Sequence, residues 1–103
     1  MTSQSVLCLR ASTEPFVLIV EPWAEEFEIH LTDECQLVAL HPEAPPSFGL
    51  ELAPGRLVVC VNEGGSTYEF WRTGRREFKT SVAIPLMPFS GSPADHRPWW
   101  RFW

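Results

Sequence analysis

The chain has 103 residues, a hydrophobic share of 45% and a formal net charge of −5, which fit one domain with a single modest core. Its longest apolar run, FVLIV, is too short to cross a bilayer as a helix, and its first residues lack the basic and apolar regions of a secretory signal. Three widely spaced cysteines (Cys8, Cys35 and Cys60) argue against a disulfide-stapled fold and predict reduced, mostly buried thiols in a cytoplasmic protein.

Alternating or short apolar runs follow one another along most of the chain, and no window has the 3.6-residue period of a helix. The expected strands are residues 5–11, 15–23, 25–32, 35–41, 48–52, 56–62, 67–72 and 76–82. Proline and glycine separate them, at residues 41–47, at Pro54 and Gly55, at residues 63–66, and at Thr73 and Gly74. The apolar runs FVLIV and RLVVCV predict two strands that are buried on both faces.

Strands of this length, spaced about 8 to 12 residues apart, predict an all-β fold: an antiparallel β-sandwich or small barrel of about seven to eight short strands. Residues 1–90 are expected to form a single β domain. Residues 91–103 are expected to be a linker and an aromatic C-terminal arm, because SGSPADHRP precedes a cluster of large aromatic side chains.

Charge is distributed unevenly along the chain. Residues 1–55 hold nine acidic residues and one basic residue, a net charge of −8, whereas residues 56–103 hold seven basic and four acidic residues, a net charge of +3. Two interpretations stay open: the two halves attract each other within one fold, or two faces of the molecule meet different partners.

Candidate catalytic and metal-binding residues form no recognised pattern. His30, Cys35 and His41 are spaced unlike the ligands of a standard zinc site. Each cysteine sits in an expected strand, where burial would suppress thiolate chemistry. We therefore predict no catalytic residue, no metal site and no cofactor.

A basic cluster surrounds the turn at Thr73 and Gly74, formed by Arg72, Arg75, Arg76 and Lys79. With the neighbouring aromatic side chains it is a candidate contact for an anion or a nucleic acid. The acidic pI of about 5.1 disfavours nucleic acid as the partner. A charged hairpin tip that protects a sheet edge from aggregation is the favoured interpretation.

An acidic cluster is formed by Glu25, Glu26 and Glu28 in the stretch EEFEIHLT. It is a candidate contact for a basic partner protein, because opposite charges steer association. The same alternation is also typical of a strand with one solvated polar face, which is the simpler interpretation.

The aromatic arm contains Trp99, Trp100, Arg101, Phe102 and Trp103. Exposed aromatic side chains need a covering surface, which is the arm's own subunit, a neighbouring subunit or a membrane interface. The low local positive charge disfavours the membrane. We expect a subunit contact and hence a homo-oligomer.

Two stretches give a partial resemblance to a family. The turn EPWAEEF, of the form E-P-W-x-E-x-aromatic, and the later GSTYEFWRTG resemble a small, uncharacterised bacterial all-β family over about residues 16–78. That family has a proline–glycine turn where this chain has HLTDE. The resemblance implies a small β fold and no established activity.

A fainter architectural likeness connects the chain with single-domain cupins. Their metal-binding H-x-H cluster is missing, because His30 and His41 are eleven positions apart. The sequence therefore predicts a non-catalytic binding or interaction module that self-associates through its arm and has a protein partner. The alternatives are a cupin-like barrel that binds a small molecule or acts as an enzyme, and an acidic inhibitor or immunity-type protein for a basic partner.

Overall fold

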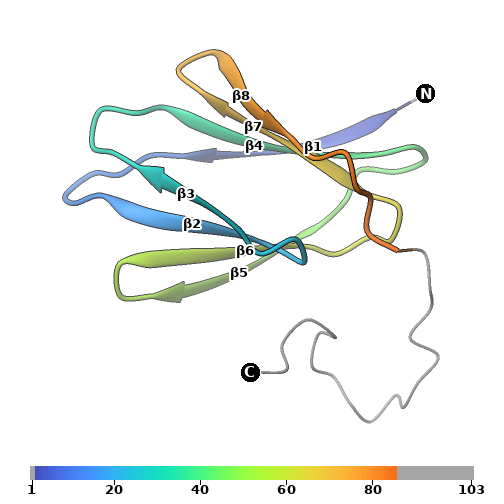
Figure 1. The fold of residues 1–103 in the computed structure, drawn as a ribbon, viewed down its shortest axis with the longest axis horizontal. Helices are drawn as coiled ribbons and strands as arrows, with labels where there is room; N and C mark the ends of the chain where they lie inside the picture. Colours follow the sequence, from blue (N-terminus) through green and yellow to red (C-terminus); the bar gives the residue numbers. More distant parts are fainter. Residues whose placement is uncertain (1, 86–103) are drawn as a thin grey trace, which may run out of the picture.

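The computed structural model describes residues 2–85, and the all-β fold class is confirmed there: eight strands form two four-stranded sheets, with no helix among these residues (Figure 1). The strands are β1 (Ser3–Leu9), β2 (Phe16–Glu21), β3 (Glu25–Ile29), β4 (Cys35–His41), β5 (Phe48–Ala53), β6 (Arg56–Val61), β7 (Thr67–Arg72) and β8 (Arg75–Lys79). The sheet orders are β1-β4-β7-β8 and β3-β2-β6-β5. The two open sheets make a sandwich and not a closed barrel.

One strand pair departs from the antiparallel expectation. Strands β2 and β6 run parallel, with Leu18 opposite Leu57 and Val20 opposite Val59. Five other pairs are antiparallel, three of them hairpins: β2–β3, β5–β6 and β7–β8. The parallel pair arises because the chain crosses to the other sheet as β4 before it returns as the β5–β6 hairpin, so the link from β2 to β6 is long enough to reverse direction.

Two short turns form where the sequence predicts them. Pro54 and Gly55 join β5 to β6, and Gly55 has a φ of 74°, a conformation that glycine adopts without strain. Thr73 and Gly74 join β7 to β8 with φ values of 50° and 77°. Two successive positive φ values define a type I′ turn, whose twist matches that of the flanking strands.

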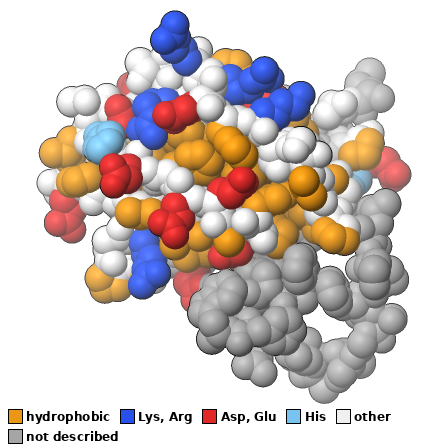
Figure 2. Space-filling model, viewed as in Figure 1, with side chains coloured by type: hydrophobic (Ala, Val, Ile, Leu, Met, Phe, Trp, Pro, Cys, Tyr) orange, Lys and Arg blue, Asp and Glu red, His pale blue; other side chains and the backbone are white. Residues whose placement is uncertain are grey.

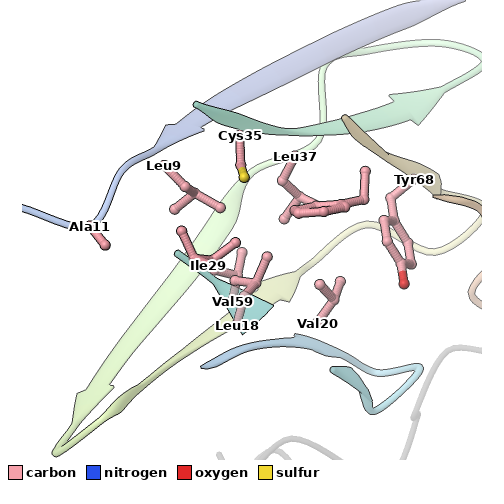
Figure 3. Packing of buried hydrophobic residues seen from close by; sticks show 10 residues of the cluster. Leu9, Ala11, Leu18, Val20, Ile29, Cys35, Leu37, Val59 and Tyr68 are labelled. Atoms are coloured by element: carbon pink, nitrogen blue, oxygen red, sulfur yellow. The ribbon is translucent and has the colours of Figure 1, made fainter. Parts of the chain in front are cut away.

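The core lies between the sheets and is built from the alternate, inward-facing residues of the strands (Figure 3). Side chains with no exposure include Leu18, Val20, Ile29, Leu37, Val59, Tyr68 and Phe70. The prediction that β2 and β6 are buried on both faces is wrong for the described residues. The outward-facing Ile19 and Val58 are only half-buried, although Glu21 at the end of β2 is buried.

The cysteines only partly follow the prediction of buried thiols. Cys35 is buried in the core and Cys60 is half-buried, and burial raises the pKa of both thiols. Cys8 is exposed, contrary to expectation, because it lies on the outer face of the edge strand β1, opposite the exposed Gln36. All three are free thiols.

After β8, residues 80–85 run back across the end of the sandwich without forming a strand. The Ile84 N–H donates to the Ser66 carbonyl at 2.9 Å, and the Gly65 N–H donates to the Ile84 carbonyl at 2.7 Å. The Trp23 indole N–H donates to the Val82 carbonyl at 2.7 Å. The expected domain boundary at residue 90 and the aromatic arm lie outside the described residues. Within the described part, no helix is long and apolar enough to cross a membrane.

Candidate interaction surface

Aromatic contacts fix how the two sheets are stacked. The Phe27 ring of β3 stacks on the Phe70 ring of β7 with centroids 4.3 Å apart, and it meets the Phe78 ring of β8 at 5.6 Å. Strand β3 therefore lies across from β7 and β8. The other two edge strands, β1 and β5, are left together on the opposite side of the sandwich, which we call the open side.

The chain crosses between the sheets at both ends of the open side. Residues 10–15 connect β1 to β2 at one end, and residues 42–47 connect β4 to β5 at the other. The Ser5 hydroxyl donates to the Pro46 carbonyl at 2.5 Å, and the Ser3 hydroxyl donates to the Glu43 carbonyl at 3.3 Å. The 42–47 loop therefore covers the first residues of β1, whereas β5 has no comparable cover among the described residues.

Two leucines of β5 are far more exposed than their position in the sheet would suggest. Leu50 lies opposite Val59 and Leu52 lies opposite Leu57, so both are on the inward face of the sheet. Val59 is fully buried, but Leu50 is 59% exposed and Leu52 is 82% exposed. The described side chains of the facing sheet leave both leucines largely uncovered. The open side thus presents two apolar side chains to solvent.

A surface hollow of about 400 Å³ lies beside Leu52. The connection between β1 and β2 forms one wall, with Ala11 and Phe16, and the β5–β6 hairpin forms the other, with Leu57. The charged side chains Arg10, Glu14 and Arg56 also line it. The β5 edge, by which we mean strand Phe48–Ala53 with its outward backbone, therefore continues into a hollow lined by both apolar and charged residues.

The edges on the opposite side of the sandwich carry charge instead. Strand β3 has three glutamates, and strand β8 has Arg75, Arg76 and Lys79. Charged side chains on an edge strand oppose pairing with another chain. In the described chain, β5 is the edge strand that combines large exposed apolar side chains with a single charged residue, Glu51.

The three glutamates predicted to meet a basic partner do not share one face. Glu25 points inward and accepts a hydrogen bond from the Tyr68 hydroxyl. Burial raises the pKa of Tyr68, and the bond to Glu25 and the charge of Glu25 add to the effect. Glu26 and Glu28 point outward beside Ile19 and Val17. Only these two of the three can face a partner at this surface.

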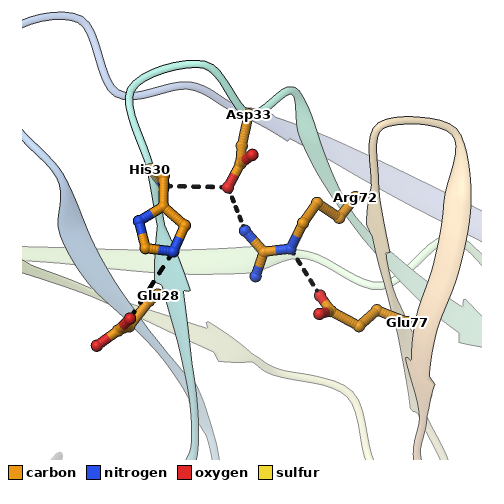
Figure 4. A network of polar contacts seen from close by, with 5 residues as sticks. All are labelled: Glu28, His30, Asp33, Arg72 and Glu77. Atoms are coloured by element: carbon orange, nitrogen blue, oxygen red, sulfur yellow. Dashed lines mark hydrogen bonds and ion pairs between the residues drawn. The ribbon is translucent and has the colours of Figure 1, made fainter.

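In the predicted basic cluster, Arg72 forms ion pairs within the fold (Figure 4). Its guanidinium donates to Asp33 and, at 2.9 Å, to Glu77, and Arg72 is only 23% exposed. Burial acts against ionisation of Asp33, but hydrogen bonds from the His30 N–H and from Arg72 lower its pKa overall. This network ties the β3–β4 turn to the β7–β8 hairpin.

The other basic residues remain at the surface. Arg76 lies 3.5 Å from a Glu69 carboxylate oxygen, whereas Arg75 and Lys79 are exposed and form no ion pair with a described residue. Basic side chains gather over the β7–β8 hairpin at the top of the view in Figure 2. Of the predicted anion contact, only Arg75, Arg76 and Lys79 at the hairpin tip therefore remain exposed to solvent.

The histidines and Cys35 weighed as metal ligands are not brought together. Cys35 and His41 occupy opposite ends of β4, about 20 Å apart along a strand of this length. The Nδ1 atom of His41 accepts the Glu43 N–H at 3.1 Å, so its Nε2–H donates to the Gly64 carbonyl at 3.0 Å. His30 lies 3.8 Å from Glu28. Among residues 2–85, no three His, Cys, Asp or Glu side chains are placed to hold a metal ion.

The described residues therefore define a two-sheet β-sandwich whose β5 edge exposes two leucines. Comparisons with protein-family models, curated proteins and solved structures found no match for the chain. Trp99, Trp100, Arg101, Phe102 and Trp103 lie outside the described residues. The exposure of Leu50 and Leu52 was not predicted from the sequence. The signal for it is the alternating stretch FGLEL between a proline-rich loop and a tight turn, which is typical of an edge strand.

Proposed function

We propose that the protein is a non-catalytic interaction module that self-associates. The observation that carries this proposal is the β5 edge, where Leu50 and Leu52 face the open side of the sandwich and are mostly exposed. Burial of a leucine side chain contributes about 1.5 to 3 kcal/mol. Two such side chains on each of two subunits supply a useful part of the free energy of a weak or moderate association.

The aromatic arm is a second candidate contact in the same assembly. Its four aromatic side chains, Trp99, Trp100, Phe102 and Trp103, each have about 150 to 250 Å² of surface to bury. We also propose a cytoplasmic location. Three free thiols, one of them exposed, support a reducing compartment.

A basic protein is a second candidate partner. Glu26 and Glu28 are exposed on the outer face of β3, next to the half-buried Val17 and Ile19 of β2. An apolar stripe flanked by carboxylates would suit a partner with a basic, apolar surface. This binding would use the outer face of the sheet, whereas self-association uses its edge, so the two are separable by substitution.

Light scattering of the full-length chain over a wide range of concentration tests self-association. The weight-average mass is expected to rise above the 11.7 kDa of one chain as concentration increases. A control with Glu26 and Glu28 changed to Gln should show the same rise, because these residues lie away from the β5 edge. A constant mass of one chain at every concentration would contradict the proposed function.

A further inference from the structure

We infer that the partner at the β5 edge is the β5 edge of a second copy, paired antiparallel about a twofold axis. This inference rests on the proposed self-association and names its geometry. The two four-stranded sheets β3-β2-β6-β5 would then join into one continuous eight-stranded sheet. A twofold pairing is closed, so it yields a dimer and not an open fibre.

The backbone of β5 is correctly disposed for this pairing. Ala53 and Arg56 flank the two-residue turn and form a directly opposed pair, which in such hairpins is a hydrogen-bonded pair. Hydrogen bonding alternates along the strand, so Gly49 and Glu51 also bond toward β6. The N–H and C=O groups of Leu50 and Leu52 therefore point to the free edge, where no described strand accepts them.

Charge and shape select the register. If Leu50 lies opposite Leu50 of the partner subunit, then Leu52 lies opposite Phe48 of the partner subunit, and Glu51 falls opposite a glycine. A shift by one step of two residues toward the turn would set Glu51 against its own copy, which like-charge repulsion disfavours. A further shift would place Leu50 against Pro54, which has no N–H to donate. A shift in the other direction would place Leu52 against Pro46, which likewise has no N–H to donate. We therefore assign the register centred on Leu50.

This register also covers the exposed side chains. Residues directly opposite one another in a sheet share a face, so the leucines of both copies lie together on the inward face of the joined sheet. Each copy then covers the apolar atoms that the other leaves exposed, with Leu50 at the centre. Edges β3 and β8 are poorer candidates for the same contact, because their self-pairing brings like charges together. Edge β1 carries no charge, but Ser3 and Ser5 at its start already bond to the 42–47 loop.

Disulfide trapping tests the register in the full chain. The background variant carries Cys8→Ser and Cys60→Ser, which leaves only the buried Cys35, and its mass by light scattering should match that of the unmodified chain. In this background Leu50→Cys is expected to form a covalent dimer under mild oxidation, because opposed residues lie within disulfide range. Leu52→Cys is the matched control. Its two copies would lie about 13 Å apart along the strands, so it should remain uncrosslinked.

Mixing Phe48→Cys with Leu52→Cys should give the mixed covalent dimer, because these positions face each other in the assigned register. Leu50→Lys should raise the dimer dissociation constant by about 100-fold or more, as expected for a central apolar contact. Leu31→Lys is the control at another exposed leucine, 48% exposed on the β3–β4 turn, and should leave the dissociation constant unchanged.

The outcomes separate the inference from the proposed function. A chain that is monomeric at all concentrations contradicts both. A dimer that survives Leu50→Lys overturns the β5 pairing but leaves self-association standing. A dimer that traps Leu52→Cys in place of Leu50→Cys overturns the assigned register. A dimer that is lost on deletion of residues 97–103 and kept in Leu50→Lys assigns the association to the aromatic arm and also overturns the inference.

Discussion

Tyr68 offers a sharp test of the described core, because it is the single tyrosine of the chain. Its ring is fully buried, 4.6 Å from the Trp23 ring, and its hydroxyl donates to the Glu25 carboxylate. The perturbation is Tyr68→Phe, which removes one oxygen and keeps the ring. A hydrogen bond to a charged acceptor contributes about 1.5 to 3 kcal/mol, and Glu25 is partly solvated, so the loss should be near the lower end of this range at neutral pH.

The pH dependence of this difference follows from the raised pKa of Tyr68. An unfolded chain ionises tyrosine near pH 10, whereas the folded chain holds the hydroxyl protonated to higher pH. The stabilisation is therefore complete below pH 10 and is lost as pH rises above it. Each pH unit above 10 should lower the free energy of unfolding by about 1.4 kcal/mol in the unmodified chain. Tyr68→Phe lacks this contribution, so the two stabilities should converge near pH 11.

Two measurements check this reasoning. Urea unfolding of both proteins at a series of alkaline pH values gives the stability difference, and the cysteine and lysine contributions cancel because both proteins contain them. Ultraviolet absorption of the phenolate reports the ionisation of Tyr68 directly. It should appear together with unfolding and not before it. A phenolate signal that titrates reversibly near pH 10 in the folded protein would refute the buried, hydrogen-bonded placement, as would a stability difference independent of pH.

Other predictions concern the ion-pair network and a turn. The pKa of Asp33 is lowered in the folded state, so its contribution to stability is present above the unfolded-state pKa and is lost as pH falls through the folded-state pKa. In Asp33→Asn the free energy of unfolding should therefore fall less steeply as the solution is acidified. Urea unfolding between neutral and acid pH measures this difference. Gly55→Ala should lower the free energy of unfolding by about 1 to 2 kcal/mol, because alanine is strained at a φ of 74°. A Cβ at this position meets no atom within 4 Å, so the backbone conformation is the whole cause. An unchanged midpoint in thermal or urea unfolding would contradict the turn geometry. His41→Ala should lower the unfolding midpoint, because the backbone N–H groups of Glu43 and Ala44 lose their shared acceptor, and protection of these N–H groups in hydrogen exchange should fall with it.

Local patterns in the sequence were sufficient to predict most strands and turns. The alternation of Phe27 and Ile29 with Glu26 and Glu28 is a property of the strand itself, and it appears in the structure as one buried and one exposed face. The turn at Pro54 and Gly55 follows from backbone preferences of those two residues. The parallel pairing of β2 with β6 could not be predicted in this way, because it depends on which sheet each hairpin joins.

Dependence on sheet stacking also explains why members of the predicted basic and acidic clusters lie in different places. Arg72, Arg75 and Arg76 look alike in the sequence, but strand parity turns Arg72 toward Asp33 across the sandwich, and Arg75 stays at the hairpin tip. Glu25 and Glu26 are adjacent, so they necessarily point to opposite faces. Which of the two faces meets Tyr68 depends on how the sheets stack, and stacking is a contact between residues more than forty positions apart.

The exposure of the β5 edge follows from unequal coverage of the two edges of one sheet. On the β3 edge, aromatic rings from β7 and β8 cover the inward-facing Phe27. On the β5 edge, the facing strand β1 contributes the small residues Ser3 and Ser5 at one end, and these bond to the 42–47 loop. Leu50 and Leu52 thus have the side chains of core residues without the covering layer of a core. An apolar residue on the inward face of an edge strand is stabilised only when something completes that layer, and an antiparallel second copy supplies the matching leucines and backbone groups at once.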